Sequence, residues 1–242
     1  MSTAELTDTK PGRLGEFLDG ARHGLPVVLA SVPFGLLFGA LAVQNGFSIG
    51  EATLMSAIVF AGASQMVGLE LFGQTIAPWL IVLSIFAVNF RHVLYSAALG
   101  RRVPHWTPAQ RATGFFFLTD PQYAEGEKKS LRGGLSFVWF MGMAIPIYIF
   151  WLIDTVVGAA FGNLIPNPEA FGLDFMLPIY FLGLVMDFRK RPMWLPVVLA
   201  SAVMSIAAFH IVGSPWHVSI GALAGVVLAA ALTPSRGVKG RT

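Results

Sequence analysis

"MSAIVFAGASQMVGLELF", residues 55–72, decides how this chain passes through a membrane. It belongs to an apolar run over 52–72, which is long enough to cross a bilayer because a transmembrane helix takes about 20 residues. Small and polar residues, from Gly62 to Gln65, stand in the middle of this run. Irregular backbone at membrane depth is tolerated only where it is buried in protein or lines a cavity. The run over 52–72 is therefore expected to be a broken or re-entrant segment.

The rest of the chain is equally apolar. Of its 242 residues, 55% are hydrophobic and only 12% are charged, whereas a soluble domain carries roughly 25% charge. The apolar residues form continuous blocks, which argues against the short alternating strands of a transmembrane barrel. We expect an all-α, polytopic helical membrane protein with about seven transmembrane helices. The apolar runs lie at 24–45, 52–72, 77–99, 112–118, 135–162, 172–188, 193–212 and 216–233.

One of these runs is too short to cross. The piece at 112–118 is expected to be a second broken or re-entrant segment, and in transporters such interrupted segments point to the binding site. No polar stretch is long enough to hold a soluble domain. A single membrane domain is therefore expected over 1–242, with a polar N-terminal segment at 1–23 and a basic C-terminal tail at 234–242.

Lys and Arg residues orient the chain in the membrane. They cluster at four places, which the positive-inside rule assigns to the cytoplasm: Arg101-Arg102-Arg111, Lys128-Lys129-Arg132, Arg189-Lys190-Arg191 and Arg236-Lys239-Arg241. Three long apolar runs precede the first cluster. If all three cross, the N-terminus lies outside; if 52–72 does not cross, the N-terminus lies inside. Both alternatives are open at this point.

Composition excludes several kinds of site. There is no cysteine, so disulfides, iron–sulfur centres and thiolate zinc sites are excluded. No metal-ligand spacing is present, and no cofactor is expected. The net charge of +3 does not indicate nucleic-acid binding, because the basic residues stand beside apolar runs, where membrane orientation explains them.

The most polar face inside an apolar run lies in "VNFRHVLYSAALGRR", residues 88–102. On a helix, Asn89 and His92 share one stripe, and Arg91 and Tyr95 share the neighbouring one. Arg91 precedes the end of the run at Leu99 by about 12 Å of helix rise. A charge at that depth is costly and needs a partner inside the protein. Arg91 is expected to form a structural ion pair, to reach toward the cytoplasmic interface, or to bind an anionic group such as a substrate carboxylate.

Two carboxylates are the strongest candidate partners. Asp120 follows an aromatic run, and Asp154 interrupts the apolar run over 135–162. A carboxyl group shielded from water can exchange a proton near neutral pH. Asp120 and Asp154 are therefore candidate proton-coupling residues, with pairing to Arg91 or to a nearby hydroxyl as the structural alternative.

Five blocks resemble the AzlC-type branched-chain amino acid permease family, and they occur in that family's order. They are "PFGLLFGALAVQNGFS", "MSAIVFAGASQMVGLELF", "VNFRHVLYSAALGRR", "FFFLTDPQYA" and "GLDFMLPIYFLGLV". The resemblance covers roughly residues 25–188. It implies export of branched-chain amino acids across a bacterial cytoplasmic membrane, together with a small AzlD-type membrane subunit.

Carried over by position, the resemblance points to Pro33, Phe34, Gly35, Gly62, Ser64, Gln65, Asn89, Arg91, His92, Thr119 and Asp120. One departure matters. The family commonly has an acidic residue after the Thr-Asp pair, where this chain has Pro121. Asp120 would therefore act alone in any role that uses two adjacent carboxylates.

We therefore expect a secondary transporter, not an enzyme, that carries branched-chain or similar amphipathic amino acids and is ion- or proton-coupled. Its substrate site would lie at the membrane midplane and comprise Arg91, Asn89, His92, Tyr95, Ser64, Gln65 and Gly62, with Asp120 and Asp154 in proton coupling. A channel or a non-transporting assembly subunit is the alternative. An intramembrane serine hydrolase is a remote one, with Ser64 as nucleophile and His210 as base.

Overall fold

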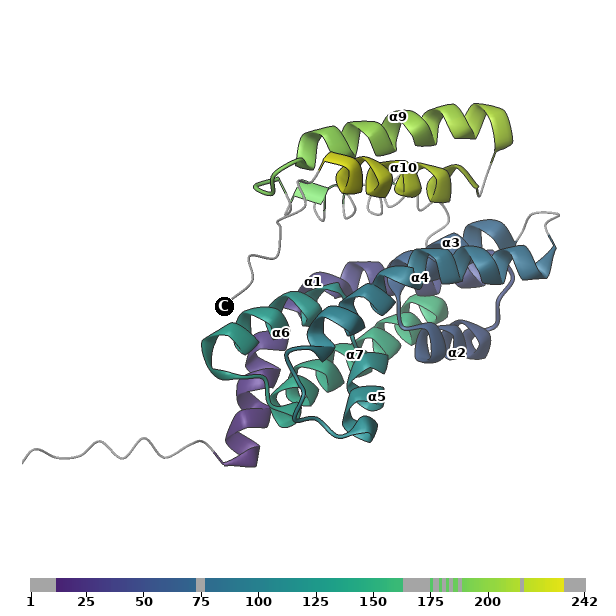
Figure 1. The fold of residues 1–242 in the computed structure, drawn as a ribbon. Coiled ribbons are helices and arrows are strands. Elements are labelled where there is room, and N and C mark those ends of the chain that lie inside the picture. Colours follow the sequence, from purple (N-terminus) through teal and green to yellow (C-terminus); the bar gives the residue numbers. More distant parts are fainter. Residues whose placement is uncertain are drawn as a thin grey trace, which may run out of the picture. The chain divides into compact units, whose positions relative to one another are not determined.

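The computed structural model describes residues 12–72, 77–162, 189–213 and 216–232 and the single positions 175, 179, 182, 185 and 186. Its contacts divide the chain into two compact units, Met1–Leu173 and Asp174–Thr242, and each is described by itself. All regular structure in the described residues is helical (Figure 1). The helices are α1 (Arg13–Gln44), α2 (Ile49–Val59), α3 (Gly62–Phe72), α4 (Pro78–Gly100), α5 (Pro108–Phe116), α6 (Asp120–Gly133), α7 (Phe137–Phe161), α9 (Trp194–Val212) and α10 (Trp216–Leu232).

The all-α membrane fold expected from the sequence is confirmed. Four helices, α1, α4, α7 and α9, are long and apolar enough to span a membrane. The expected number of seven is not confirmed, and the run over 172–188 lies mostly outside the described residues. The tail over 234–242 also lies outside them, and the single membrane domain stays a prediction.

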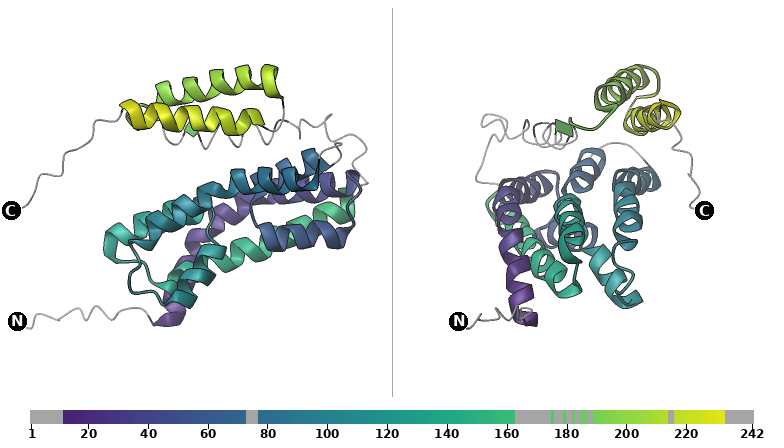
Figure 2. Two further views of the ribbon diagram at one scale, coloured as in Figure 1. Left: turned by 45° about the vertical axis from the view of Figure 1, so that its right-hand side comes forward. Right: turned by 60° about the vertical axis from the view of Figure 1, so that its left-hand side comes forward.

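Two parallel helices form the centre of the first unit. α1 and α7 lie side by side in both views of Figure 2. Near their starts Gly20 lies against Trp139, and near their ends Gly162 lies against Ala40. A side chain on Gly158 would collide with the main-chain carbonyl of Leu36. Small residues at such contacts let two membrane helices approach closely.

A helical hairpin, α2–α3, follows α1. Ser48 and Glu51 form a capping box that starts α2, with each side chain bonded to the other residue's main chain. α2 ends at Val59, and the next residue, Phe60, has a φ of 41° that turns the chain back; α3 begins two residues after it. Gly68 of α3 then lies against Met55 of α2. The two helices are thus antiparallel, and the break expected within 52–72 is confirmed.

The α2–α3 hairpin enters and leaves at one end of the unit. The ring of Phe72, where α3 ends, is 4.5 Å from the ring of Phe47, which precedes α2. α4 then runs back in the opposite direction, because Ser64 bonds Asn89 and Gly68 lies against Ile85. Residues 52–72 therefore form a re-entrant hairpin rather than a span.

A second hairpin, α5–α6, follows α4 and enters from the other end. Thr107 and Gln110 form the capping box that starts α5, which is only nine residues long. α6 begins after a short turn and runs alongside α4, so that Gly126 lies against Leu99. The piece expected at 112–118 is thus the end of α5 and the turn that follows it. Hydropathy alone did not reveal α6, because its sequence is polar.

The two hairpins meet at their tips. Phe60 of the first tip lies 6.3 Å from Phe117 of the second, measured between ring centroids. Both rings pack edge-on against Tyr148, at 4.9 and 5.1 Å. Tyr148 stands near the middle of α7, so the tips meet at about half the depth of the unit.

The basic end of α6 locates the start of α1. Lys129 Nζ lies 3.0 Å from Asp19 Oδ2, and Trp139 Nε1 donates to the same oxygen over 2.7 Å. The start of α1 therefore lies at the same end of the unit as the basic cluster at 128–132, which the positive-inside rule makes cytoplasmic. From here on, α2–α3 is called the outer hairpin and α5–α6 the inner hairpin.

The second unit contains one close helix pair. α9 and α10 lie side by side in Figures 1 and 2. A side chain on Gly221 would meet Ser205, and one on Gly225 would collide with Ser201. The glycines at 221 and 225 therefore have the packing role that four-residue spacing predicts.

Candidate functional site

Arg91 is paired with Asp120 across the interface of α4 and α6. Its Nη1 lies 3.1 Å from Asp120 Oδ2, with the two side chains 23% and 14% exposed. Tyr95, one turn further along α4, donates its hydroxyl to Asp120 Oδ1 over 2.8 Å. Of the partners expected for Arg91, the structure therefore shows Asp120. The carboxylate uses both oxygens to hold the inner hairpin against α4.

The first turn of α6 explains why Asp120 stands there. Thr119 is extended and precedes the helix, and Pro121 occupies the first turn, where its missing N–H is not needed. An acidic residue in the first turn is favoured by the helix dipole. Tyr123, one turn further, stacks on Tyr95 with ring centroids 4.4 Å apart. The departure from the family pattern at Pro121 thus fits a helix start.

The polar face of α4 also contacts the outer hairpin. Ser64 donates its hydroxyl to Asn89 Oδ1 over 2.5 Å, which links α3 to α4. His92 Nδ1 lies 3.2 Å from the main-chain oxygen of Asn89, a contact within α4. Because Ser64 is bonded to an amide oxygen, which is not a general base, this geometry gives no support to a hydrolase.

Gln65 lies in a buried polar network between the outer hairpin and α7. Its Nε2 donates to Ser56 Oγ over 2.8 Å, and its Oε1 accepts from Trp151 Nε1 over 3.2 Å. The hydroxyls of Ser56 and Thr155 are 2.8 Å apart. All four side chains are buried. Gly62 allows this approach, since a side chain there would lie 2.9 Å from the Trp151 ring.

Asp154 is not part of either cluster. It lies on α7 against Gly35 of α1, where a Cβ on the glycine would be 2.6 Å from the Asp154 Cβ. Its Oδ2 is buried and has no hydrogen-bond partner among the residues that the structure describes. The two candidate proton-coupling carboxylates are therefore in different settings, one ion-paired and one without a partner at Oδ2.

Several residues of these clusters were not found from the sequence. They are Phe60, Phe117 and Tyr148 at the tips, Ser56, Trp151 and Thr155 in the buried network, and Gln122 at the start of α6. The sequence does contain a signal for the two short segments that lead to the tips. Ser48-x-x-Glu51 and Thr107-x-x-Gln110 are capping-box sequences, and each begins a short segment that leads to a tip.

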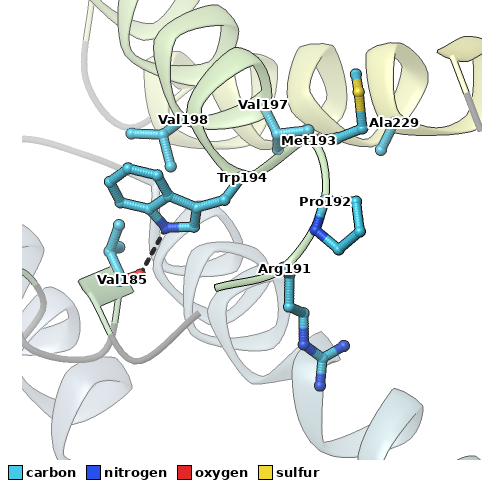
Figure 3. A pocket seen from close by; sticks show the side chains of 8 residues that line it. All are labelled: Val185, Arg191, Pro192, Met193, Trp194, Val197, Val198 and Ala229. Carbon is cyan, nitrogen blue, oxygen red and sulfur yellow. Dashed lines mark hydrogen bonds between the residues drawn. The ribbon is translucent and has the colours of Figure 1, made fainter. Parts of the chain in front are cut away.

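A cavity of about 340 Å³ lies within the second unit, at the start of α9 (Figure 3). Trp194 Nε1 donates to the main-chain oxygen of Val185 over 2.7 Å beside it. None of the side chains expected at the substrate site lines this cavity. Its lining includes Val185, Pro192, Met193, Trp194, Val197 and Ala229.

Comparison with known proteins gives a consistent result. A family profile described as AzlC protein matches residues 26–165. The inner membrane protein YgaZ of Escherichia coli is 31% identical over 220 residues, which cover 87% of this chain and 86% of YgaZ. A membrane protein of Archaeoglobus fulgidus is 31% identical over 215 residues, covering 88% of this chain and 93% of that protein. No solved structure matches the chain.

A more distant relative carries a functional name. The branched-chain amino acid transport protein AzlC of Bacillus subtilis is 21% identical over 167 residues, covering 68% of this chain and 65% of that protein. The resemblance found in the sequence is thus confirmed. The location expected for the chain, a multi-pass protein of the bacterial inner membrane, agrees with its four candidate spans and with the names of its relatives.

Proposed function

The chain belongs to the AzlC family of membrane transport proteins, and on this premise we propose that it exports branched-chain amino acids. It would act as the large subunit beside a small AzlD-type membrane subunit. The name of the Bacillus subtilis relative supports the substrate class. The observation that carries the proposal is the Arg91–Asp120 ion pair, which lies where the inner hairpin begins its return and close to the meeting of the two tips.

Arg91 would hold the substrate carboxylate. A guanidinium binds a carboxylate with two parallel hydrogen bonds, and Asp120 now occupies part of that capacity. The substrate would therefore replace Asp120 on Arg91. Asn89, His92 and Tyr95 would line the same face of α4. Across the tips, the segment from Gly62 through Ser64 to Gln65 would line the side of the outer hairpin.

The aromatic cluster at the tips would receive the aliphatic side chain. Phe60, Phe117 and Tyr148 pack edge-on around one point. Binding sites for small molecules combine such apolar walls with a few oriented polar groups. A branched aliphatic amino acid has both parts: a charged end for Arg91 and an apolar end for the rings.

A proton on Asp120 would link transport to the proton gradient. Protonation removes the negative charge that pairs with Arg91 and so frees Arg91 for a substrate carboxylate. Asp154 would be a second proton-binding group, because its Oδ2 has no partner in the described part of the chain. We expect Asp120→Asn to retain exchange of labelled leucine but to lose flux driven by a pH gradient.

The proposal is tested by transport in liposomes that contain the protein together with its small subunit. Counterflow of labelled leucine or valine is expected for the wild type, which also separates a carrier from a channel. Arg91→Ala should abolish counterflow, whereas Arg101→Ala should not, because Arg101 is exposed at the end of α4. Unchanged counterflow in Arg91→Ala would remove Arg91 from the substrate site.

A further inference from the structure

The two hairpins are an inverted pair, and their tips can be compared residue by residue. From the cytoplasmic end of the unit, α1, α2 and α3 run outward, inward and outward. α4, α5 and α6 run inward, outward and inward. The tips read "FAGASQ" at 60–65 and "FLTDPQ" at 117–122. Gln65 and Gln122 thus occupy equivalent places, in the first turn of α3 and of α6. Both side chains are fully buried.

The equivalent glutamines differ in their bonding. Gln65 uses both ends of its amide, toward Ser56 and Trp151. Gln122 Oε1 accepts from the hydroxyl of Thr119, and its Nε2 has no partner in the described parts of the chain. The cause lies in α7. Its outer half offers Gln65 the indole N–H of Trp151, whereas in its inner half the buried indole N–H of Trp139 is already bonded to Asp19, and Phe140, Met143 and Ile147 are apolar.

Three features at the start of α6 favour a bound anion. No side chain caps this helix, so the positive end of its dipole lies open at the tip. Gln122 is bonded to Thr119, the residue that precedes the helix, and its Nε2 is a buried donor with no partner in the described residues. Arg91 Nε is also buried without a partner in the described residues. Unpaired donors at membrane depth are costly, which makes an acceptor from a ligand favourable.

We infer that the carboxylate of the transported amino acid binds at the start of α6, where it accepts a hydrogen bond from Gln122 Nε2 beside Arg91. This inference rests on the proposed function and deepens it. It makes the inner hairpin, rather than the outer one, the part that recognises the carboxylate.

Matched substitutions of the two glutamines test the inference. Gln122→Met removes an unpaired donor together with the one bond from Thr119, so the thermal midpoint of the purified complex without substrate should change little. Its Kd for leucine should rise about ten- to hundredfold, the effect of losing a hydrogen bond to a charged group. Gln65→Met leaves Trp151 Nε1 without its partner and takes from Ser56 one of its two partners, so the midpoint of this variant should fall.

A leucine analogue identifies the group that Gln122 contacts. 3-Methylbutylamine is leucine without its carboxylate, and the wild type should bind it much more weakly than leucine. Gln122→Met should reduce this preference. A variant that keeps the full preference, or one whose midpoint falls as far as that of Gln65→Met with an unchanged Kd for leucine, overturns the inference.

The binding measurements test the proposed function and the role of Gln122 separately. A wild-type protein that binds neither leucine nor valine overturns the proposed function and the inference together. Binding by the wild type that Gln122→Met leaves intact overturns the inference alone.

Discussion

The outer and inner hairpins are both pairs of short helices, and they differ in the hydrogen bonds that their buried polar side chains form. In the outer hairpin, Ser64 is bonded to Asn89, and Gln65 is bonded at both ends of its amide. In the inner hairpin, Gln122 Nε2 has no partner in the described residues. A satisfied buried network holds its members in one arrangement, whereas an unsatisfied donor favours a ligand. The outer hairpin is thus a fixed support, and our inference makes the inner hairpin the element that binds the substrate carboxylate.

Both hairpins depend on the α1–α7 pair. A substitution that separates α1 from α7 should therefore destabilise both hairpins rather than one of them. Gly158→Ala places a methyl group against the main-chain carbonyl of Leu36, which cannot move without separating the two helices. We expect a loss of about 3 kcal/mol or more in the free energy of unfolding, measured by denaturant unfolding in detergent. Gly133→Ala is the control, because a methyl group there meets nothing within 4 Å. Equal stability of the two variants would contradict the close packing.

The outer hairpin alone should weaken when its link to α7 is cut. Trp151→Phe removes the indole N–H that Gln65 Oε1 accepts and leaves that buried oxygen unpaired. The expected loss in the free energy of unfolding is about 2 kcal/mol. Trp79→Phe is the matched control, since Trp79 is an exposed residue of α4. A larger effect at Trp79 than at Trp151 would show that the network does not support the hairpin.

One tyrosine hydroxyl donates a hydrogen bond at each hairpin, so the contributions of the two bonds to stability can be compared directly. Tyr95 donates to the carboxylate of Asp120 at the inner hairpin, and Tyr148 donates to the main-chain oxygen of Ala57 at the outer hairpin. A bond to a charged group is stronger, so Tyr95→Phe should cost about 2 kcal/mol of unfolding free energy and Tyr148→Phe about 1 kcal/mol. Unfolding of both variants in the same detergent gives the comparison. The reverse order would contradict the greater strength of the Tyr95–Asp120 bond.

The smallest expected difference lies where the hairpins begin. The Ser48 main chain and hydroxyl donate to the Glu51 carboxylate and lower its pKa below the usual value of 4.5. A lowered pKa means that the stabilisation is present above the unfolded pKa and is lost as pH falls through the folded one. Hydrogen exchange of the first-turn amides of α2 should therefore accelerate on acidification, after correction for intrinsic rates.

The inner hairpin supplies the control for that measurement. Its capping box is formed by Thr107 and Gln110, and neither side chain titrates. The first turn of α5 should therefore keep its protection over the same range of pH. A parallel loss of protection in both helices would indicate general unfolding rather than titration of Glu51.

Much of the fold was accessible from local sequence patterns. Long apolar runs predicted α1, α4, α7 and α9, because hydropathy is a property of neighbouring residues. The small and polar residues between Gly62 and Gln65 predicted the break, which the structure places just before them at Phe60. The inner hairpin was predicted only in part, since its second helix is polar and reads as a loop. α6 lies against α4 because Asp120 pairs with Arg91, and the composition of α6 does not show this contact.

The candidate site was predicted as a set of residues but not as an arrangement. The helical period placed Asn89, Arg91, His92 and Tyr95 on one face of α4, and the structure has that helix. The sequence pattern did not decide whether Asp120 or Asp154 is the partner of Arg91. That choice depends on where α6 and α7 lie relative to α4.

By itself, then, the sequence determined that the protein is a helical membrane protein, that the run over 52–72 contains a break, and that the helix over 78–100 carries a polar face. These properties follow from residues close together in the chain. Only the tertiary structure decided that α1 and α7 run parallel and that the two hairpins meet tip to tip. It also decided that both ends of the Gln65 amide are bonded, whereas Gln122 Nε2 has no partner in the described residues. Those properties depend on contacts between distant residues, such as Ser56 with Thr155, which no local pattern contains.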